Sequence, residues 1–287
     1  MLTYVDSIIQ GILLGGLYSL FAAGLSIVFG VMRLVNIAHG DFIVLGAYIA
    51  LGIVSLTHAN PFLVLVLVVP LMALLGYGLQ RLVVEKTLGE DLLPPLLVTF
   101  GLAVIIQNGL LALLSTDAKR LSSGNIETAS IKVSEISIGV LPLLTFVIAV
   151  VLIATMEKVF FRSKIGRAFR ATSDDAETAL TMGINTKHVF GMAMAVSFGV
   201  IAISAILLAT RSSFDPFSGP ARLIYGFEAV IIGGLGNLWG TLAGGIVLGV
   251  AQTLGAQISP SMQILTGHIV FFAVLAIRPR GLFPRMD

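Results

Sequence analysis

The sequence contains no cysteine and few charged residues, and each of these two features excludes some classes of protein. Without cysteine, the chain can form no disulfide framework, no thiolate metal site and no thiol nucleophile. Charged residues make up 11% of the 287 residues, whereas a soluble domain has about a quarter. So few charged residues cannot cover the surface of a soluble protein of 287 residues. We therefore expect much of the surface to face lipid.

The sequence also lacks the common enzymatic motifs. It has no Walker A sequence, no G-x-S-x-G and no H-E-x-x-H. Its four histidines are scattered, without a spacing that would hold a metal. The small excess of 17 basic over 15 acidic residues favours orientation in a membrane over binding of nucleic acid. We therefore predict no catalytic residues, no metal site and no bound cofactor in this chain.

Long apolar runs dominate what is present. Hydrophobic residues make up 57% of the chain, and the mean hydropathy is +1.02. Eight runs have a length suited to a membrane-spanning helix, and the run at 223–235 is too short. It ends in glycines, which predicts a re-entrant or broken helix that dips in without crossing. We expect an all-α, polytopic transmembrane bundle in one domain, 1–287, with runs at 8–31, 42–57, 61–80, 95–115, 138–158, 189–210, 223–235, 237–256 and 260–277.

Most of the 17 Lys and Arg residues lie in connections that fall on one side of the membrane. They concentrate in the 158–187 loop and the C-terminal tail, which predicts that both are cytoplasmic and that the N-terminus is external. The strings at 11–17 and 240–246 also echo each other on helices of opposite direction. This echo is either part of an inverted repeat, as in many transporters, or a chance recurrence of Gly/Leu strings.

A few polar residues lie next to apolar sequence. Asn36, His39 and Asp41 precede the second run and would line or gate a pathway, because polar groups at membrane depth are costly elsewhere. The alternative is a short turn in which Asp41 caps the next helix. Glu228 and Asn237, in and after the short run, are candidates for the same pathway. Gln107 and Asn108 are expected to form structural hydrogen bonds between helices.

The loop at about 159–188 contains the pattern of a short, capped helix. Asp174 with Glu177 predicts the capped start of a short helix over 173–183, and Gly183 predicts its end. Such a helix between two spanning helices is suited to pressing on another protein.

The chain resembles the LivH-type permease subunits of branched-chain amino-acid ABC importers over nearly its whole length. The matching stretches are Gly-Gly-Leu-Tyr-Ser-Leu at 15–20, Val-Asn-Ile-Ala-His-Gly-Asp at 35–41, Gly-Arg-Ala-Phe-Arg-Ala-Thr at 166–172, Gly-Gly-Leu-Gly at 233–236 and Arg-Pro-Arg-Gly-Leu-Phe at 278–283.

The resemblance implies an importer with a second permease, two cytoplasmic ATPase subunits that bind ATP and Mg²⁺, and a periplasmic binding protein. The loop would be the coupling helix, although it has Glu-Thr-Ala at 177–179 where the general motif has Glu-Ala-Ala. The residues expected to contact the ATPase are Arg167, Arg170, Asp174, Asp175, Glu177, Ala179 and Gly183.

The competing interpretation is a stand-alone secondary transporter or channel for a small polar solute such as urea or an amide. It would need its own coupling-ion site, and the acidic residues expected at membrane depth are only Asp41 and Glu228. The resemblance does not choose among substrates, since relatives carry branched-chain amino acids, amides and small acids. We also expect the external segments at 116–137 and 211–222 to contact the binding protein.

Overall fold

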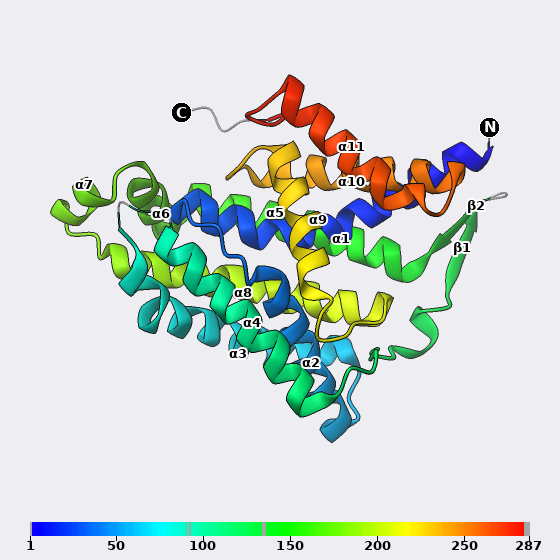
Figure 1. Cartoon of the computed structure of the whole chain (residues 1–287), viewed down its shortest axis with the longest axis horizontal. Coiled ribbons are helices and arrows are strands. Elements are labelled where there is room, and N and C mark those ends of the chain that lie inside the picture. Colours follow the sequence, from blue (N-terminus) through cyan, green and yellow to red (C-terminus); the bar gives the residue numbers. More distant parts are fainter. Residues whose placement is uncertain (1, 90, 92, 134–135, 284–287) are drawn as a thin grey trace.

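Long helices form most of the protein, as Figure 1 shows. The structure is a computed structural model that describes residues 2–89, 91, 93–133 and 136–283. Seven helices in these residues are long and apolar enough to cross a membrane. They are α1 Leu2–Met32, α2 His39–Thr57, α3 Pro61–Leu82, α4 Leu93–Leu114, α5 Val140–Arg162, α8 Thr186–Arg211 and α10 Leu238–Ile258.

Shorter elements connect them. A 3-10 turn, η1 (Val84–Thr87), follows α3, and a second one, η2 (Gly124–Ile126), precedes a hairpin of strands β1 (Ser130–Val133) and β2 (Ile136–Gly139). The remaining helices are α6 Lys164–Asp174, α7 Ala176–Thr181, α9 Gly219–Gly233 and α11 Met262–Ile277. Helices α6 and α7 lie at one end of the molecule and the hairpin at the other (Figure 1).

Two features of the spans differ in detail from the expectation. The run at 260–277 forms the 16-residue helix α11, about 24 Å long and shorter than the seven long spans. It returns the chain from the end of α10 to the α9–α10 junction, where the Leu282 nitrogen donates to the carbonyl oxygen of Ile232. The short run does not dip in and return. Phe214 pairs with Lys119 near the hairpin, whereas Gly236 packs on Gly30 near α6. The connection at 212–218 and α9 together therefore cross from one end to the other.

The helices pair in a way that indicates an inverted repeat. Helix α1 packs antiparallel to α10, where a Cβ on Gly15 would lie 2.5 Å from the Cα of Ile246. Helix α3 packs antiparallel to α8 in the same manner. The helices thus form two groups of four, α1–α4 and α8–α11. The first helix of one group packs on the third helix of the other group, as α1 does on α10 and α8 does on α3. The strings at 11–17 and 240–246 lie on helices that pack together, α1 and α10, and not on equivalent helices.

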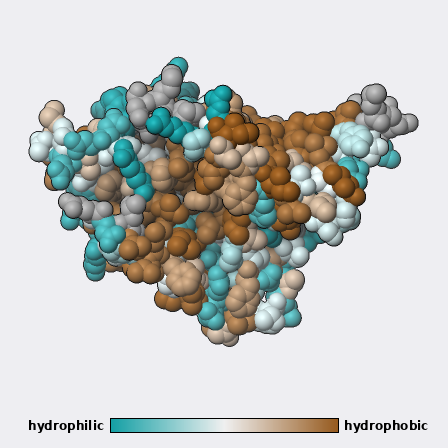
Figure 2. All heavy atoms as spheres, turned by 45° about the horizontal axis from the view of Figure 1, so that its top comes forward, coloured by the Kyte–Doolittle hydropathy of each residue, from teal (hydrophilic) through white to brown (hydrophobic). Residues whose placement is uncertain are grey.

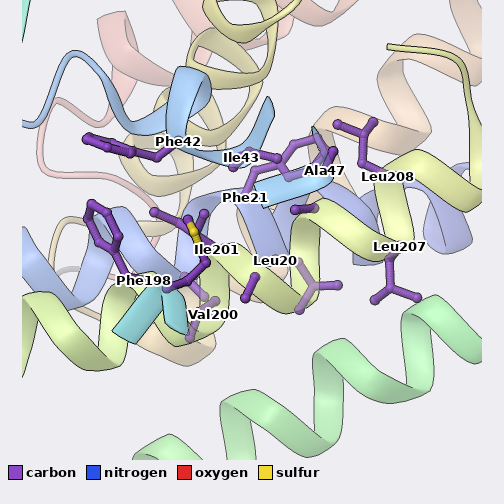
Figure 3. Close-up of a cluster of buried hydrophobic side chains, with 14 of the residues drawn as sticks. Leu20, Phe21, Phe42, Ile43, Ala47, Phe198, Val200, Ile201, Leu207 and Leu208 are labelled. Atoms are coloured by element: carbon purple, nitrogen blue, oxygen red, sulfur yellow. The ribbon is translucent and has the colours of Figure 1, made fainter. Parts of the chain in front are cut away.

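The main hydrophobic core lies where α1, α2 and α8 meet. Figure 3 shows Phe21 of α1, Phe42 of α2 and Phe198 of α8 among the labelled side chains of this cluster. All three are buried, and the rings of Phe42 and Phe198 lie 4.6 Å apart. This packing holds the start of α2 in the interior of the bundle.

The outer surface is apolar between two more polar ends. Figure 2 shows hydrophobic side chains across the middle of the face and hydrophilic ones gathered at the end that carries α6 and α7. Helices α3, α4 and α5 have few buried residues in their most apolar windows. An apolar belt of this kind is suited to contact with lipid or with another membrane helix.

Candidate functional site

The first turns of α2 and α9 meet inside the bundle. Both helices begin near the middle of the molecule, each after a connection that leads back from one of its ends (Figure 1). A Cβ on Gly40 would overlap the carbonyl oxygen of Gly219, and a Cβ on Gly219 would overlap Oδ1 of Asp41. We call this contact the central crossing. It brings two helix N-termini, which favour negative charge, close to each other.

Two of the predicted pathway residues have structural roles at this crossing. The Oδ1 of Asn36 accepts a hydrogen bond from the Ala38 backbone nitrogen at 3.0 Å, which shapes the turn before α2. The Nε2 of His39 lies 2.9 Å from the carbonyl oxygen of Phe21, and its ring packs on Gly24 of α1. Both side chains are 1% exposed. They fix the start of α2 against α1.

Asp41 lies in the first turn of α2 and is also buried. Its Oδ1 accepts a hydrogen bond of 2.8 Å from Nε2 of Gln107 in α4. Gln107 therefore forms the interhelical hydrogen bond expected of it, whereas Asn108 donates, within the described residues, only to Val104 in its own helix. The Asp41 carboxylate is placed where the N-termini of α2 and α9 can stabilise it.

Glu228 pairs with a residue that the sequence did not single out. Its Oε1 contacts Nδ1 of His268 in α11, and its Oε2 is buried with no hydrogen-bond partner among the described residues. The His268 side chain is 34% exposed. The only signal for His268 in the sequence is an ionisable residue inside an apolar run.

Asn237 lies apart from this group. It caps α10, where its Oδ1 accepts from the Gly240 nitrogen at 2.9 Å, and it donates to the carbonyl oxygen of Phe283. Asn237 thus lies near α6 and the C-terminal segment, and the structure does not bring it together with Asn36, His39 and Asp41.

The predicted coupling loop contains two helices where one was expected. The spanning helices α5 and α8 extend to Arg162 and Thr186, so the connection is 163–185. Asp174 ends α6 and does not cap a helix. The cap of α7 is Asp175, whose Oδ1 accepts from the nitrogens of Glu177 and Thr178 at 2.9 and 3.0 Å. A hydrogen bond from the Thr178 hydroxyl, together with these two backbone hydrogen bonds, lowers the pKa of Asp175, so the cap persists until the pH falls through that lowered value.

Helix α7 ends at a glycine, as predicted. Gly183 has φ 82°, and the Ile184 nitrogen donates to the carbonyl oxygen of Ala179 at 3.0 Å. This is a Schellman motif, which stops a helix and satisfies its last carbonyl groups. Ala179 is buried, while Glu177 is on the exposed side of α7. A six-residue helix with both ends capped has a defined shape despite its length.

Helix α6 is fixed to the spanning helices. The Ser173 hydroxyl donates to the carbonyl oxygen of Gly30 in α1 at 2.5 Å, and Phe169 is buried next to Phe160 of α5. Arg170 donates to the carbonyl oxygen of Phe160 in α5 and is half-buried. Arg167 remains exposed.

A cleft of about 890 Å³ opens beside α6. It lies between α1, α5, α6 and the α9–α10 junction, and both signs of charge line it through Arg33, Arg280 and Asp174. The cleft adjoins Gly30 and Gly236, where α1 and the end of α9 touch. A change in the position of α6 would therefore reach α1 directly, through the contact of Ser173 with Gly30.

Comparison with known proteins shows the family to which this chain belongs. The family model described as the branched-chain amino acid transport system / permease component matches residues 7–277. The chain belongs to this permease family. It is a multi-pass membrane protein with a transport role, as the sequence analysis predicted.

Several curated members of this permease family match along their length. The chain is 27% identical to the high-affinity branched-chain amino acid transport system permease protein BraD of Pseudomonas aeruginosa, over 99% of this chain and 97% of BraD. It is 25% identical to the permease protein LivH of Escherichia coli, over 100% and 97%. It is 24% identical to LivM of the same species, over 93% of this chain and 68% of LivM. No solved structure matches the chain.

Proposed function

We propose that this chain is a permease subunit of an ABC importer in the inner membrane. It would pass a small solute, a branched-chain or other hydrophobic amino acid, while separate subunits bind ATP and Mg²⁺ and hydrolyse the ATP. The observation that carries the proposal is the α6–α7 unit at one end of a family permease, capped at Asp175 and Gly183 and fixed to α1 through Ser173.

The geometry supports a coupling role for this unit. A transporter driven by a separate ATPase needs a stiff element that receives the movement and passes it to spanning helices. Helix α6 contacts α1, α5 and α8, and α7 contacts α8. The first turn of α8 is further tied to η1 by an ion pair of 3.2 Å between Lys187 and Glu85. A displacement of α7 would therefore be transmitted, directly or through α6, to the spanning helices α1, α5 and α8.

The proposed partners include a second permease. The chain resembles both LivH and LivM, so two related subunits could pair through equivalent faces. His268 supports the face of α9 and α11 as that interface, because a histidine one-third exposed in an apolar helix is costly against lipid. The pathway would then run between the subunits, with Asp41 and Glu228 beside it. A periplasmic binding protein would deliver the solute at the hairpin end.

The proposal is tested by purification and by a binding screen. The affinity-tagged chain should bring down a second permease and an ATPase subunit from its own membrane, in amounts that indicate a stable complex. Recovery of the chain alone, folded and without an ATPase, would instead favour a stand-alone transporter or channel. A screen of amino acids and amides against the cognate binding protein would then define the substrate.

A further inference from the structure

A second cavity lies between α1, α8 and α9, close to the central crossing. Its volume is about 230 Å³, below the roughly 300–1,000 Å³ of pockets for drug-sized ligands, so it suits a smaller solute. Arg222 stands one turn beyond Gly219, which forms the crossing, and it lines this cavity from α9. Arg211 lines it from the end of α8.

The two arginines have no acidic partner in the described part of the chain. No ion pair there involves either residue, and Nε of Arg222 is buried without a hydrogen-bond partner. Arg211 donates only one long hydrogen bond, of 3.3 Å, to the carbonyl oxygen of Leu13. Glu228, less than two turns further along α9, is held by His268 instead. Both arginines are half-buried, and a half-buried guanidinium with no acidic partner keeps donors that suit an anion, so an anion is the expected complement.

The rest of the cavity is apolar and aromatic. Leu14 and Leu17 of α1 form one wall, and the stacked rings of Tyr18 and Tyr225 form another, with centroids 4.9 Å apart. The Tyr18 hydroxyl is already used, since it donates to Gln252 at 2.6 Å. The cavity therefore offers positive charge at one side and an apolar surface at the other.

We propose that this cavity binds a small solute by its carboxylate, which Arg211 and Arg222 hold while its apolar side chain packs on Leu14 and Leu17. The proposal rests on the proposed function as a solute permease and adds to it a site and a ligand chemistry. A guanidinium presents a planar set of donors that fits a carboxylate in a bidentate manner, which makes arginine better suited than lysine here. The site lies between the hairpin end and the central crossing, on the route toward Asp41.

Arginine modification in the wild-type complex tests the site without any substitution. The complete complex in lipid nanodiscs would be treated with phenylglyoxal, and adducts on each arginine of this chain would be measured by mass spectrometry. L-leucine and 4-methylpentanoate, which both carry a carboxylate, should lower modification of Arg211 and Arg222 severalfold. Isoamylamine, which lacks the carboxylate, should not, and Arg81 in its exposed ion pair with Glu85 should react equally in every case.

Substitutions provide a second measurement. Arg222→Gln should lower uptake of leucine by the reconstituted complex by about tenfold or more, because a charge-assisted hydrogen bond is lost. Arg222→Lys, which keeps the charge, should retain part of the activity. Lys158→Gln removes the same charge from the exposed surface of α5 and should have no effect.

Unchanged modification of both arginines with millimolar leucine, in a complex that transports leucine, would overturn the proposal and leave the proposed function intact. Protection by anionic lipid in the nanodisc, and not by leucine, would overturn it as well, since the site would then hold a lipid headgroup. A complex that shows the expected protection but takes up no solute with ATP would contradict the proposed function and not the cavity.

Discussion

Two glycines determine how closely the first turns of α2 and α9 approach each other. A Cβ on Gly40 would overlap the Gly219 carbonyl oxygen and lie 2.8 Å from the Leu223 nitrogen, so Gly40→Ala must push backbone apart. We expect a loss of about 1–3 kcal/mol in folding stability, typical of overpacking. Thermal unfolding of the purified chain in detergent measures it.

Gly52→Ala is the matched control for this substitution. Gly52 lies in the same helix, but a Cβ there would meet no atom within 4 Å. This variant should unfold at the wild-type temperature or slightly above, because alanine favours the helix. Equal destabilisation by the two substitutions would mean that α2 and α9 do not touch as described.

Acidic residues near the central crossing are predicted to serve transport. Asp41→Ala and Glu228→Ala should lower solute uptake severalfold while the complex still assembles, because each removes a buried carboxyl group beside the proposed pathway. Asn108→Ala is the control, since Asn108 is exposed and bonds only within α4. Wild-type uptake by both acidic variants would place the pathway elsewhere.

At the scale of elements, the coupling unit makes a sharp prediction. Ala179→Pro removes the hydrogen bond from the Ala179 nitrogen to the carbonyl oxygen of Asp175, at 3.0 Å, and breaks α7. ATP-driven transport should be abolished and the ATPase released or uncoupled, while the binding protein still captures solute. Hydrolysis and uptake by the purified complex would be measured together.

Ala176→Pro is its matched control, because proline is well tolerated at the first helical position and Asp175 before it is already extended, with φ −154°. This variant should transport like the wild type. Full activity of Ala179→Pro in an assembled complex would remove the coupling role from α7.

The spanning helices could be predicted from the sequence because an apolar run of sufficient length has few alternatives in a membrane. Helix α6 was missed, since it is short and polar. The signal present was Ser163, whose hydroxyl oxygen accepts from the Gly166 nitrogen at 2.9 Å as an N-cap. The sequence predicts Asp174 as the cap of the coupling helix, whereas the structure has Asp175 in that role. A shift of one residue along the chain decides which of the two carboxylates faces the free backbone nitrogens of α7.

The site could be predicted only in part, because contacts between distant segments leave no local pattern. Asp41 and Gln107 are 66 residues apart, and His268 meets Glu228 across 40. The meeting of Gly40 and Gly219 likewise depends on how α2 and α9 are placed and not on the residues around either glycine.

At the scale of the whole molecule, the absence of cysteine permits a clean test of orientation. Single cysteines would replace exposed residues at the two ends, Ser122 before the hairpin and Thr181 in α7. A membrane-impermeant thiol reagent should label Ser122→Cys in intact spheroplasts, and Thr181→Cys only after the membrane is opened. Reversed labelling would contradict the proposed cytoplasmic position of α6 and α7.

The central claim is that ATP hydrolysis in partner subunits drives movement of solute through this chain. The most direct measurement is uptake of radiolabelled solute into proteoliposomes that contain the complete complex, with the binding protein outside. We predict accumulation when ATP is present on the α6–α7 side, and none with a non-hydrolysable analogue or without the ATPase subunits. Equal accumulation by the chain in the absence of ATPase and ATP would contradict the account.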